Sequence, residues 1–206
     1  MRIAVVPTRD RPDDFADCAR AIAPQVDALL VVAHGDPARH YVLDVLEYLD
    51  LAGLLTGCQI LPYDSDPPNI SNMWNLGLDS APYAAGGNPY SVAVLNDDAI
   101  VPPDWFERIV TEMKYHGAAA GCARRTHDDR MAGYAFVLDG EKGLRADEQF
   151  QWWYGDDDLQ RRAEQAGGVV YVGGLDVEHR HPNSTTVGLL ADIAEADRLR
   201  FMRKWA

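Results

Sequence analysis

Residues 92–105 have the sequence Val-Ala-Val-Leu-Asn-Asp-Asp-Ala-Ile-Val-Pro-Pro-Asp-Trp, and the other segments are arranged around this stretch. The apolar run Val92–Leu95 predicts a fully buried strand. An amide and two carboxylates follow it directly: Asn96, Asp97 and Asp98. In an open α/β sheet, ligands bind outside the carboxyl ends of the strands. A solvent-exposed turn is one interpretation of these polar residues. A site for a hard divalent cation is the other, because such a cation often needs only one or two protein carboxylates besides substrate phosphates.

Three strand–helix units are predicted before this stretch. Apolar residues at helical spacing occupy positions 15–22 and 42–49, and Asp36 is expected as the N-cap of the second helix. Because strands alternate with helices, we expect an α/β fold of three layers with a mostly parallel sheet and right-handed crossovers. The three predicted strands are Ile3–Val6, Leu29–Ala33 and Gln59–Leu61.

The second half of the chain has a less regular pattern. A helix is predicted from Trp105, and Ala84–Pro89 before it is interpreted as a surface loop. No repeat or low-complexity segment divides the chain. The remaining predicted segments are strands at Ala118–Cys122, Tyr134–Leu138 and Val169–Val172, and helices from Asp156 to about Ala166 and from about Gly188 onward.

Length and charge restrict the class of protein. A chain of 206 residues suits one sizeable α/β domain or two small ones, and it can bury a substantial core. Its formal net charge of −13 argues against nucleic acid as the main partner, because phosphate backbones require basic patches. A phosphorylated small molecule is still compatible with this charge, since a bound cation can reverse the local sign.

The cysteines and the N-terminus bear on localisation. Cys18, Cys58 and Cys122 are scattered and lack the spacing of a zinc site, so we interpret them as buried thiols in a reducing compartment. The N-terminus begins with a strand, without a charged-then-apolar leader, and no apolar run approaches the roughly 18 residues of a transmembrane helix. We expect a cytoplasmic protein without a transmembrane segment.

Two further groups of polar residues lie at predicted strand or helix ends. Thr8, Arg9 and Arg11 follow the first strand, where a nucleotide would lie across the carboxyl edge of the sheet; the two arginines can equally be surface charges. The triplet of aspartates at 156–158 opens a helix directly after an aromatic loop. The helix dipole favours carboxylates there, yet three adjacent aspartates repel one another, so capping and function both remain open.

With these segments in order, the chain resembles a GT-A-fold glycosyltransferase of the family 2 type. Val5–Pro12 resembles the opening strand and nucleotide loop of that family, and Met73–Gly77 occupies the place of its Arg-Asn-x-Gly segment. Asn96–Asp98 resembles its DxD metal motif, and Trp153–Leu159 is similar to its Glu-Asp-x-Asp-Leu segment. His179 or His181, with Ser184 and Thr185 beyond, resembles its late histidine, and Phe201–Trp205 resembles a common ending.

The resemblance implies a fold and a function. The fold is a three-layer GT-A (nucleotide-diphospho-sugar transferase-like) α/β fold with a mostly parallel, mixed central sheet, as a single domain over 1–206. Residues 1–101 would be its nucleotide-sugar-binding half and 102–206 its acceptor-binding and catalytic half. The function is that of a metal-dependent inverting glycosyltransferase, which moves a sugar from a nucleoside-diphosphate sugar to the hydroxyl of a saccharide, lipid or protein acceptor.

The resemblance also implies a role for individual residues. Asp156 would be the catalytic base, and Asp98 with His179 would hold Mn²⁺ or Mg²⁺. Acceptor contacts are expected from Trp152, Trp153 and Asp158; the two indoles can instead be half core and half surface, and Asp158 a capping group. Contacts to the nucleotide-sugar donor are expected from Pro7, Thr8, Arg9, Arg11, Asp36, Asn75, Asn96 and Asp97.

The chain departs from the family pattern at three positions. Ala33 ends the second strand, where the family usually has an aspartate that reads the nucleobase. Trp74 stands where an arginine often meets the diphosphate, and Gly155 replaces the usual glutamate before the base. These departures concern nucleotide identity, phosphate binding and catalytic efficiency.

Two other functions are compatible with the same carboxylates. A Mg-dependent phosphohydrolase or nucleotidyltransferase also clusters aspartates around metal ions, although the chain has neither a GxxxxGK[ST] loop nor a basic Gly-rich loop after the first strand. A non-catalytic relative that binds a nucleotide sugar is the third possibility, which the three departures keep open.

Overall fold

The computed structural model describes residues 1–124, 130–181 and 189–206. The expected start of the last helix near Gly188, and Ser184 and Thr185 beside the late histidines, lie outside the described residues. Among the described residues, no helix combines the length and apolar character needed to cross a membrane.

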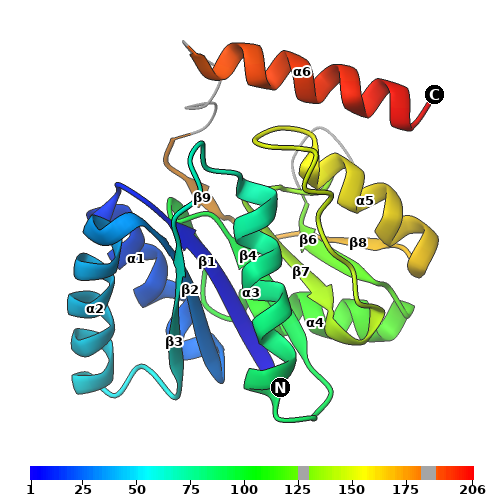
Figure 1. Cartoon of the computed structure of the whole chain (residues 1–206). Helices are drawn as coiled ribbons and strands as arrows, with labels where there is room; N and C mark the ends of the chain where they lie inside the picture. The colour runs from blue at the N-terminus through cyan, green and yellow to red at the C-terminus, as the bar shows by residue number, and fades with distance from the viewer. Residues whose placement is uncertain (125–129, 182–188) are drawn as a thin grey trace.

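A seven-stranded sheet forms the middle layer, with the strand order β3-β2-β1-β4-β7-β6-β8 (Figure 1). Only β7 is antiparallel to its neighbours β4 and β6, and the other pairings in this sheet are parallel. This confirms the expected α/β fold with a mostly parallel, mixed sheet. The strands are β1 (Arg2–Thr8), β2 (Ala28–His34), β3 (Cys58–Tyr63), β4 (Ser91–Leu95), β6 (Ala120–Ala123), β7 (Ala135–Asp139) and β8 (Val169–Val172).

Helices cover both faces of this sheet, because its inner strands carry apolar side chains on both sides. In β1, Ala4 and Val6 belong to the core beneath α1, α2 and α4, whereas Ile3 and Val5 belong to the core beneath α3 and α5. The helices are α1 (Pro12–Ile22), α2 (Gly35–Leu51), α3 (Ile70–Ala85), α4 (Trp105–His116), α5 (Gly155–Ala166) and α6 (Leu189–Lys204), with 3₁₀ turns at Ala23–Gln25 and Gly140–Lys142.

A second, two-stranded sheet lies beside the main one. It pairs β5 (Ala99–Ile100) with β9 (Glu178–His179) in antiparallel orientation. Each strand has only two residues, which is too short for an alternating pattern to appear in the sequence. This pairing positions the candidate site described below.

Three local predictions are wrong. The N-cap of α2 is His34, and Asp36 lies inside the first helical turn, because Gly35 at φ +79° lets the chain turn from β2 directly into the helix. The segment interpreted as a surface loop begins inside α3, where Ala85 is buried. Cys58 is exposed at the start of β3, whereas Cys18 and Cys122 are buried as expected.

Gly77 is where α3 approaches β1 most closely, and it provides a test of the packing. A Cβ atom at Gly77 would lie 2.2 Å from Cγ1 of Val5. A β-branched side chain in a strand has little freedom to move aside, so we expect Gly77→Ala to lower the free energy of unfolding by about 1–3 kcal/mol in urea titrations. The control is Gly173→Ala, where a Cβ meets nothing within 4 Å and the expected change is below about 0.5 kcal/mol. Equal midpoints for both variants would contradict this account of the packing.

Candidate active site

An acidic pair follows β4 at the carboxyl edge of the sheet. Asp97 and Asp98 are 9% and 1% exposed. After this pair the chain forms β5, whose Ala99 pairs with His179 of β9. This pairing brings Nε2 of His179 within 3.5 Å of Oδ1 of Asp98. Tertiary pairing therefore joins the two residues that were expected to share a metal ion.

Asp98 lies among donors. Its Oδ2 accepts hydrogen bonds from Nη1 of Arg11 at 2.9 Å and from the backbone N–H of His181 at 3.2 Å. Burial by itself would raise the pKa of Asp98. The nearby imidazole of His179, the charge of Arg11 and the His181 N–H outweigh that effect and hold the pKa of Asp98 below its ordinary value. Asp98 is therefore the ionised member of the pair.

Asp97 has a different environment. Its Oδ2 accepts a hydrogen bond from the Thr8 hydroxyl at 2.9 Å, and its Oδ1 lies 3.8 Å from Nη1 of Arg11. Burial above all, with the negative charge of Asp98, raises the pKa of Asp97 to about 7, although the Thr8 hydrogen bond and Arg11 oppose the shift. Because Thr8 has a single proton to donate, the 2.7 Å bond from Tyr41 must run from the phenol to Thr8.

Two consecutive residues connect this pair with the expected base. Tyr134 precedes β7, beside Asn96, and its ring stacks on that of His179 with centroids 4.3 Å apart and planes at 17°. Gly133 packs against Asp156, since a Cβ on Gly133 would lie 2.2 Å from Asp156 Oδ2. The acidic pair and Asp156 therefore lie at the same edge of the sheet, each beside one residue of this dipeptide.

Asp156 lies in the first turn of α5 and is half-buried. Burial first, and then the charge of Asp157, raises the pKa of Asp156 to about 6; the charge of Arg130 and hydrogen bonds from backbone N–H groups oppose the shift. Asp157 itself is held by Arg130, whose Nε and Nη2 donate to Oδ1 and Oδ2 at 3.0 and 2.6 Å. The raised pKa of Asp156 suits a base that works near neutral pH.

Asp158 is fully buried between α5 and α6. Its Oδ1 accepts hydrogen bonds from Nε1 of Trp205 at 2.9 Å and faces Nζ of Lys204 at 2.7 Å, while its Oδ2 lies 3.4 Å from Nε of Arg162. Because these contacts enclose the carboxylate, we do not propose Asp158 as an acceptor contact. Trp152 and Trp153, by contrast, are half-buried in the loop before α5.

The other expected donor contacts have varied positions. Pro7 is buried in β1, and Arg9 is exposed in the loop after it. Asp36 is exposed and ion-paired with Arg39. The amide of Asn75 is occupied by Ala146, with which it exchanges two hydrogen bonds of 2.9 and 3.0 Å. Asn75 therefore holds the loop after β7 in place, and these hydrogen bonds use both ends of its side-chain amide.

The residues beside Asp98 fit a divalent cation. Oδ1 of Asp98 and Oδ1 of Asn96 are buried and have no hydrogen-bond partner within 1–124, 130–181 and 189–206. Carboxylate and amide oxygens with an imidazole suit Mg²⁺ or Mn²⁺. The same described ranges contain no group of three or more His, Cys, Asp or Glu side chains that could hold an ion. The chain would therefore supply part of the coordination shell, and substrate oxygens would supply the rest.

Solved structures share this architecture, although no protein-family model and no curated protein matches the chain. The mannosyltransferase PcManGT from Pyrobaculum calidifontis, in complex with GDP-Man and Mn²⁺, matches with a TM-score of 0.67 and 14% identity over 89% of this chain and 57% of that one. The TarS 1–349 fragment from S. aureus matches with a TM-score of 0.61 and 10% identity, over 82% of this chain and 57% of that one. The chain has a GT-A-like glycosyltransferase fold.

The likeness extends to ligand complexes. The same TarS fragment in complex with UDP-GlcNAc matches with a TM-score of 0.57 and 12% identity, over 86% of this chain and 60% of that one. This chain thus spans 57–60% of these matched chains, and 35% of the longer TarS structure. The GT-A-like fold was the one expected from the order of the sequence motifs.

Sequence reasoning missed several polar groups at the carboxyl edge of the GT-A-like sheet. His34, His40, His116 and His127 have no partner pattern in the sequence, which predicts surface or loop residues; His127 lies outside the described residues. His34 is in fact half-buried at the end of β2, 5.6 Å from the Tyr63 ring by centroids. Nδ1 of His34 and the hydroxyl of Tyr63 are buried without a hydrogen-bond partner in the described part of the chain. Their position at strand ends was the signal that could have identified them.

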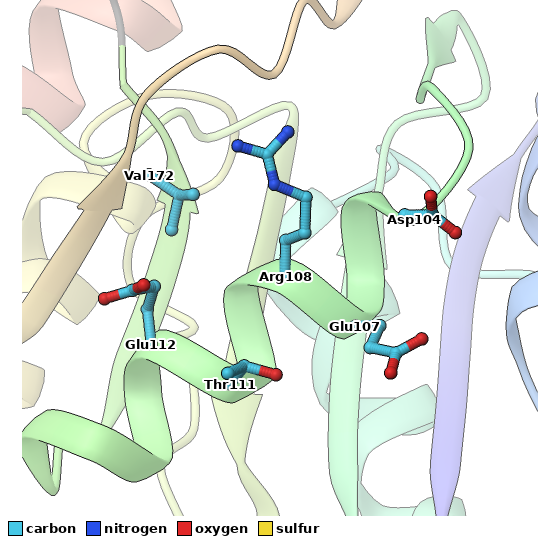
Figure 2. Close-up of a pocket in the computed structure, with 6 residues that line it drawn as sticks. All are labelled: Asp104, Glu107, Arg108, Thr111, Glu112 and Val172. Atoms are coloured by element: carbon cyan, nitrogen blue, oxygen red, sulfur yellow. The ribbon is translucent and has the colours of Figure 1, made fainter.

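A cavity of about 430 Å³ lies elsewhere, beside α4 and the end of β8 (Figure 2). Its central side chain, Arg108, donates hydrogen bonds to the carbonyls of Gly173 and Gly174 at 2.9 and 3.0 Å. None of the expected site residues lines this cavity. The lining residues are Asp104, Glu107, Arg108, Thr111, Glu112 and Val172.

Proposed function

We propose that this protein transfers a sugar from a nucleoside-diphosphate sugar to an acceptor hydroxyl, with Mn²⁺ or Mg²⁺ bound and with inversion at the anomeric carbon. The observation that carries the proposal is the Gly133–Tyr134 dipeptide, which brings the His179–Asp98 pair and Asp156 to one edge. The GT-A-like fold supports it, as do the structural neighbours, which are described with GDP-Man and Mn²⁺ or with UDP-GlcNAc.

The donor would lie across the carboxyl edge of the N-terminal half, over residues 1–101. Arg11 is the residue suited to the diphosphate, since a guanidinium can pair with phosphate as readily as with Asp98. The free Nδ1 of His34 and the Tyr63 hydroxyl offer hydrogen bonds to a nucleobase at the ends of β2 and β3, where Ala33 provides no carboxylate. Thr8 and Tyr41 would hold Asp97 in place.

The proposed reaction uses two groups of residues, one for the metal ion and one for the acceptor. Asp98, His179 and Asn96 would hold the metal ion, which as a Lewis acid stabilises the charge of the leaving nucleoside diphosphate. Asp156 would take the proton of the acceptor hydroxyl while the acceptor oxygen attacks the anomeric carbon. Because the attacking oxygen enters opposite the departing diphosphate, the configuration inverts. Trp152 and Trp153 would pack against the acceptor with their apolar faces.

A thermal-shift panel tests the donor. UDP-GlcNAc, GDP-mannose and the free nucleoside diphosphates are added with Mn²⁺ or with a chelator. A ligand at about 100 times its Kd stabilises the native state by about 2.7 kcal/mol, which corresponds to roughly 5–10 °C in a domain of this size. We expect such a shift for at least one nucleotide sugar, and only with the metal present.

Product analysis by mass spectrometry then separates the competing functions. The bound donor is incubated with the metal and a panel of methyl glycosides. A glycosylated product supports the proposal. Hydrolysis of the nucleotide without sugar transfer to any acceptor would instead indicate a phosphohydrolase. Binding without turnover would indicate a non-catalytic relative. No shift with any nucleotide would contradict all three functions.

A further inference from the structure

Helix α6 runs across the top of the molecule, on the side where β1 ends, and the loop before α5 rises toward it (Figure 1). Most of its surface is solvated, but Asp197 in its middle is fully buried. A buried carboxylate is costly unless hydrogen bonds and opposite charges satisfy it. The partners of Asp197 therefore reveal what this helix does.

Asp197 binds the backbone of residues 151–154, which we call the tryptophan loop. Its Oδ2 accepts hydrogen bonds from the N–H groups of Gln151, Trp152 and Trp153 at 3.0, 2.9 and 3.1 Å. Successive N–H groups that point to one centre form a concave anion site. Here the anion is a side chain of the same protein. Its Oδ1 pairs with Nη1 of Arg200 at 2.7 Å, which balances the charge.

The N–H groups of residues 151–153 have no partners in regular secondary structure. Residues 151–154 belong to neither a helix nor a strand, so no ladder pairs their N–H groups. Tyr154, the last of these residues, has φ +64°, a left-handed conformation that few non-glycine residues adopt, and it is the N-cap of α5. Since Asp156 lies in that first turn, the position of the loop also determines the position of the expected base.

The end of α6 also contacts Tyr154 of the loop and residues that precede the loop. Lys204 donates to Oδ2 of Asp147 at 2.6 Å, and the Phe201 ring packs 5.2 Å from that of Tyr154 and 6.3 Å from that of Phe150. Arg200 and Lys204, in the basic cluster at the end of α6, pair with the buried Asp197 and the half-buried Asp147.

We propose that Asp197 is a positioning residue, which through the N–H groups of residues 151–153 holds Trp152, Trp153 and the start of α5 in the arrangement that receives the acceptor. This inference rests on the proposed function for its catalytic consequence, but not for its structural one. Asp197 reaches none of the reacting atoms itself, and its effect on turnover passes through the loop.

Three variants of the full chain test it. Asp197→Ala removes the acceptor oxygens, and Asp197→Asn keeps one carbonyl oxygen that can still receive N–H bonds. Glu195→Gln is the matched control, because Glu195 lies on the same helix and pairs only with the exposed Arg198 in the described part of the chain. Far-UV circular dichroism and donor-induced thermal shifts confirm that each variant is folded.

Hydrogen–deuterium exchange gives the structural result. In Asp197→Ala, peptides that cover residues 150–154 should exchange on the order of tenfold faster or more, while peptides from β1 and β4 stay protected. Asp197→Asn should recover most of the protection, and Glu195→Gln should match the wild type. Unchanged exchange at 150–154 in Asp197→Ala would overturn the proposal, whatever the protein catalyses.

Kinetics with the donor and methyl glycoside found in the panel give the functional result. Asp197→Ala should raise the acceptor KM and lower kcat, by on the order of 10–100-fold in kcat/KM, with the donor KM within about twofold of the wild type. A fall in kcat with both KM values unchanged is the signature of lost active protein and would overturn the positioning role. If the wild type transfers nothing while exchange at 150–154 responds as expected, the proposed function fails and Asp197 only orders the loop.

Discussion

Asp156→Asn is expected to lower the turnover of sugar transfer by about 10²–10⁴-fold, the usual contribution of a general base. The substitution keeps the shape of the side chain against Gly133 and removes its basicity. Affinity for the nucleoside diphosphate should barely change, because Asp156 is not among the proposed donor contacts. Initial rates of transfer and calorimetry of nucleotide binding measure the two quantities separately.

Asp157→Asn is the matched control for this prediction. It changes the adjacent carboxylate, which Arg130 engages with two nitrogens. We expect Asp157→Asn to act mainly on stability and to retain most of the turnover. Transfer at the wild-type rate by Asp156→Asn, to a verified acceptor, would show that another group takes the proton.

The pH dependence follows from the same carboxyl group. A base works only when deprotonated, so wild-type turnover should rise with pH through about 6, where burial and Asp157 place the pKa of Asp156, and level off above it. A pKa raised on folding stabilises the folded protein at low pH, and this stabilisation is lost as pH rises through the folded value. Asp156→Asn should therefore abolish the step in the rate profile and be more stable than the wild type at pH 8 in urea titrations.

Asp98→Ala is expected to weaken metal-dependent nucleotide binding by at least 10–100-fold, the loss that even indirect ligand partners typically cause. Asp98 provides the ionised carboxylate of the acidic pair, with one oxygen free of hydrogen bonds to the described residues. Calorimetry with a nucleoside diphosphate, in Mn²⁺ and in chelator, measures the effect. The wild type should lose affinity in chelator, and the variant should have the low affinity in both conditions.

Asp98 also holds Arg11 and the His181 N–H, so its loss can disturb the local fold. Asp98→Asn serves as the second variant, because an amide oxygen can still accept one of these bonds. Asp79→Asn is the remote control, since Asp79 forms an exposed pair with Arg145. Identical nucleotide affinity of wild type and both Asp98 variants, with chelator making no difference, would contradict a metal role for this residue.

The main elements of the fold were predictable because their signals are local. Runs such as Ile3–Val6 and Leu29–Ala33 are apolar at every position, and such short runs are typical of a strand covered on both faces. The aspartates at 156–158 lie in the first turn of α5 as expected, although the helix begins one residue earlier, at Gly155. The direction of β7 had no such signal. Whether a strand runs parallel or antiparallel depends on its connections, and alternating hydrophobicity does not record them.

The candidate site was only partly accessible from the sequence. Asp97 and Asp98 stand out because two carboxylates directly follow a buried strand. The nearness of His179 was implied by resemblance alone, and its physical cause is the two-residue pairing of β5 with β9. Asp197 had no signal, because one more aspartate on a charged helix is unremarkable until three N–H groups 44 to 46 residues away in the chain converge on it.

The sequence by itself determined the layers of this protein and the strand ends at which its polar residues gather, because burial and turn formation depend on the order of neighbouring side chains. Only the tertiary structure decided which carboxylates share partners. It placed Gly133 against Asp156 and Tyr134 against His179, made Asp98 the ionised acid and raised the pKa values of Asp97 and Asp156. Distance, burial and charge set these properties, and each depends on residues that only the folded chain brings into contact.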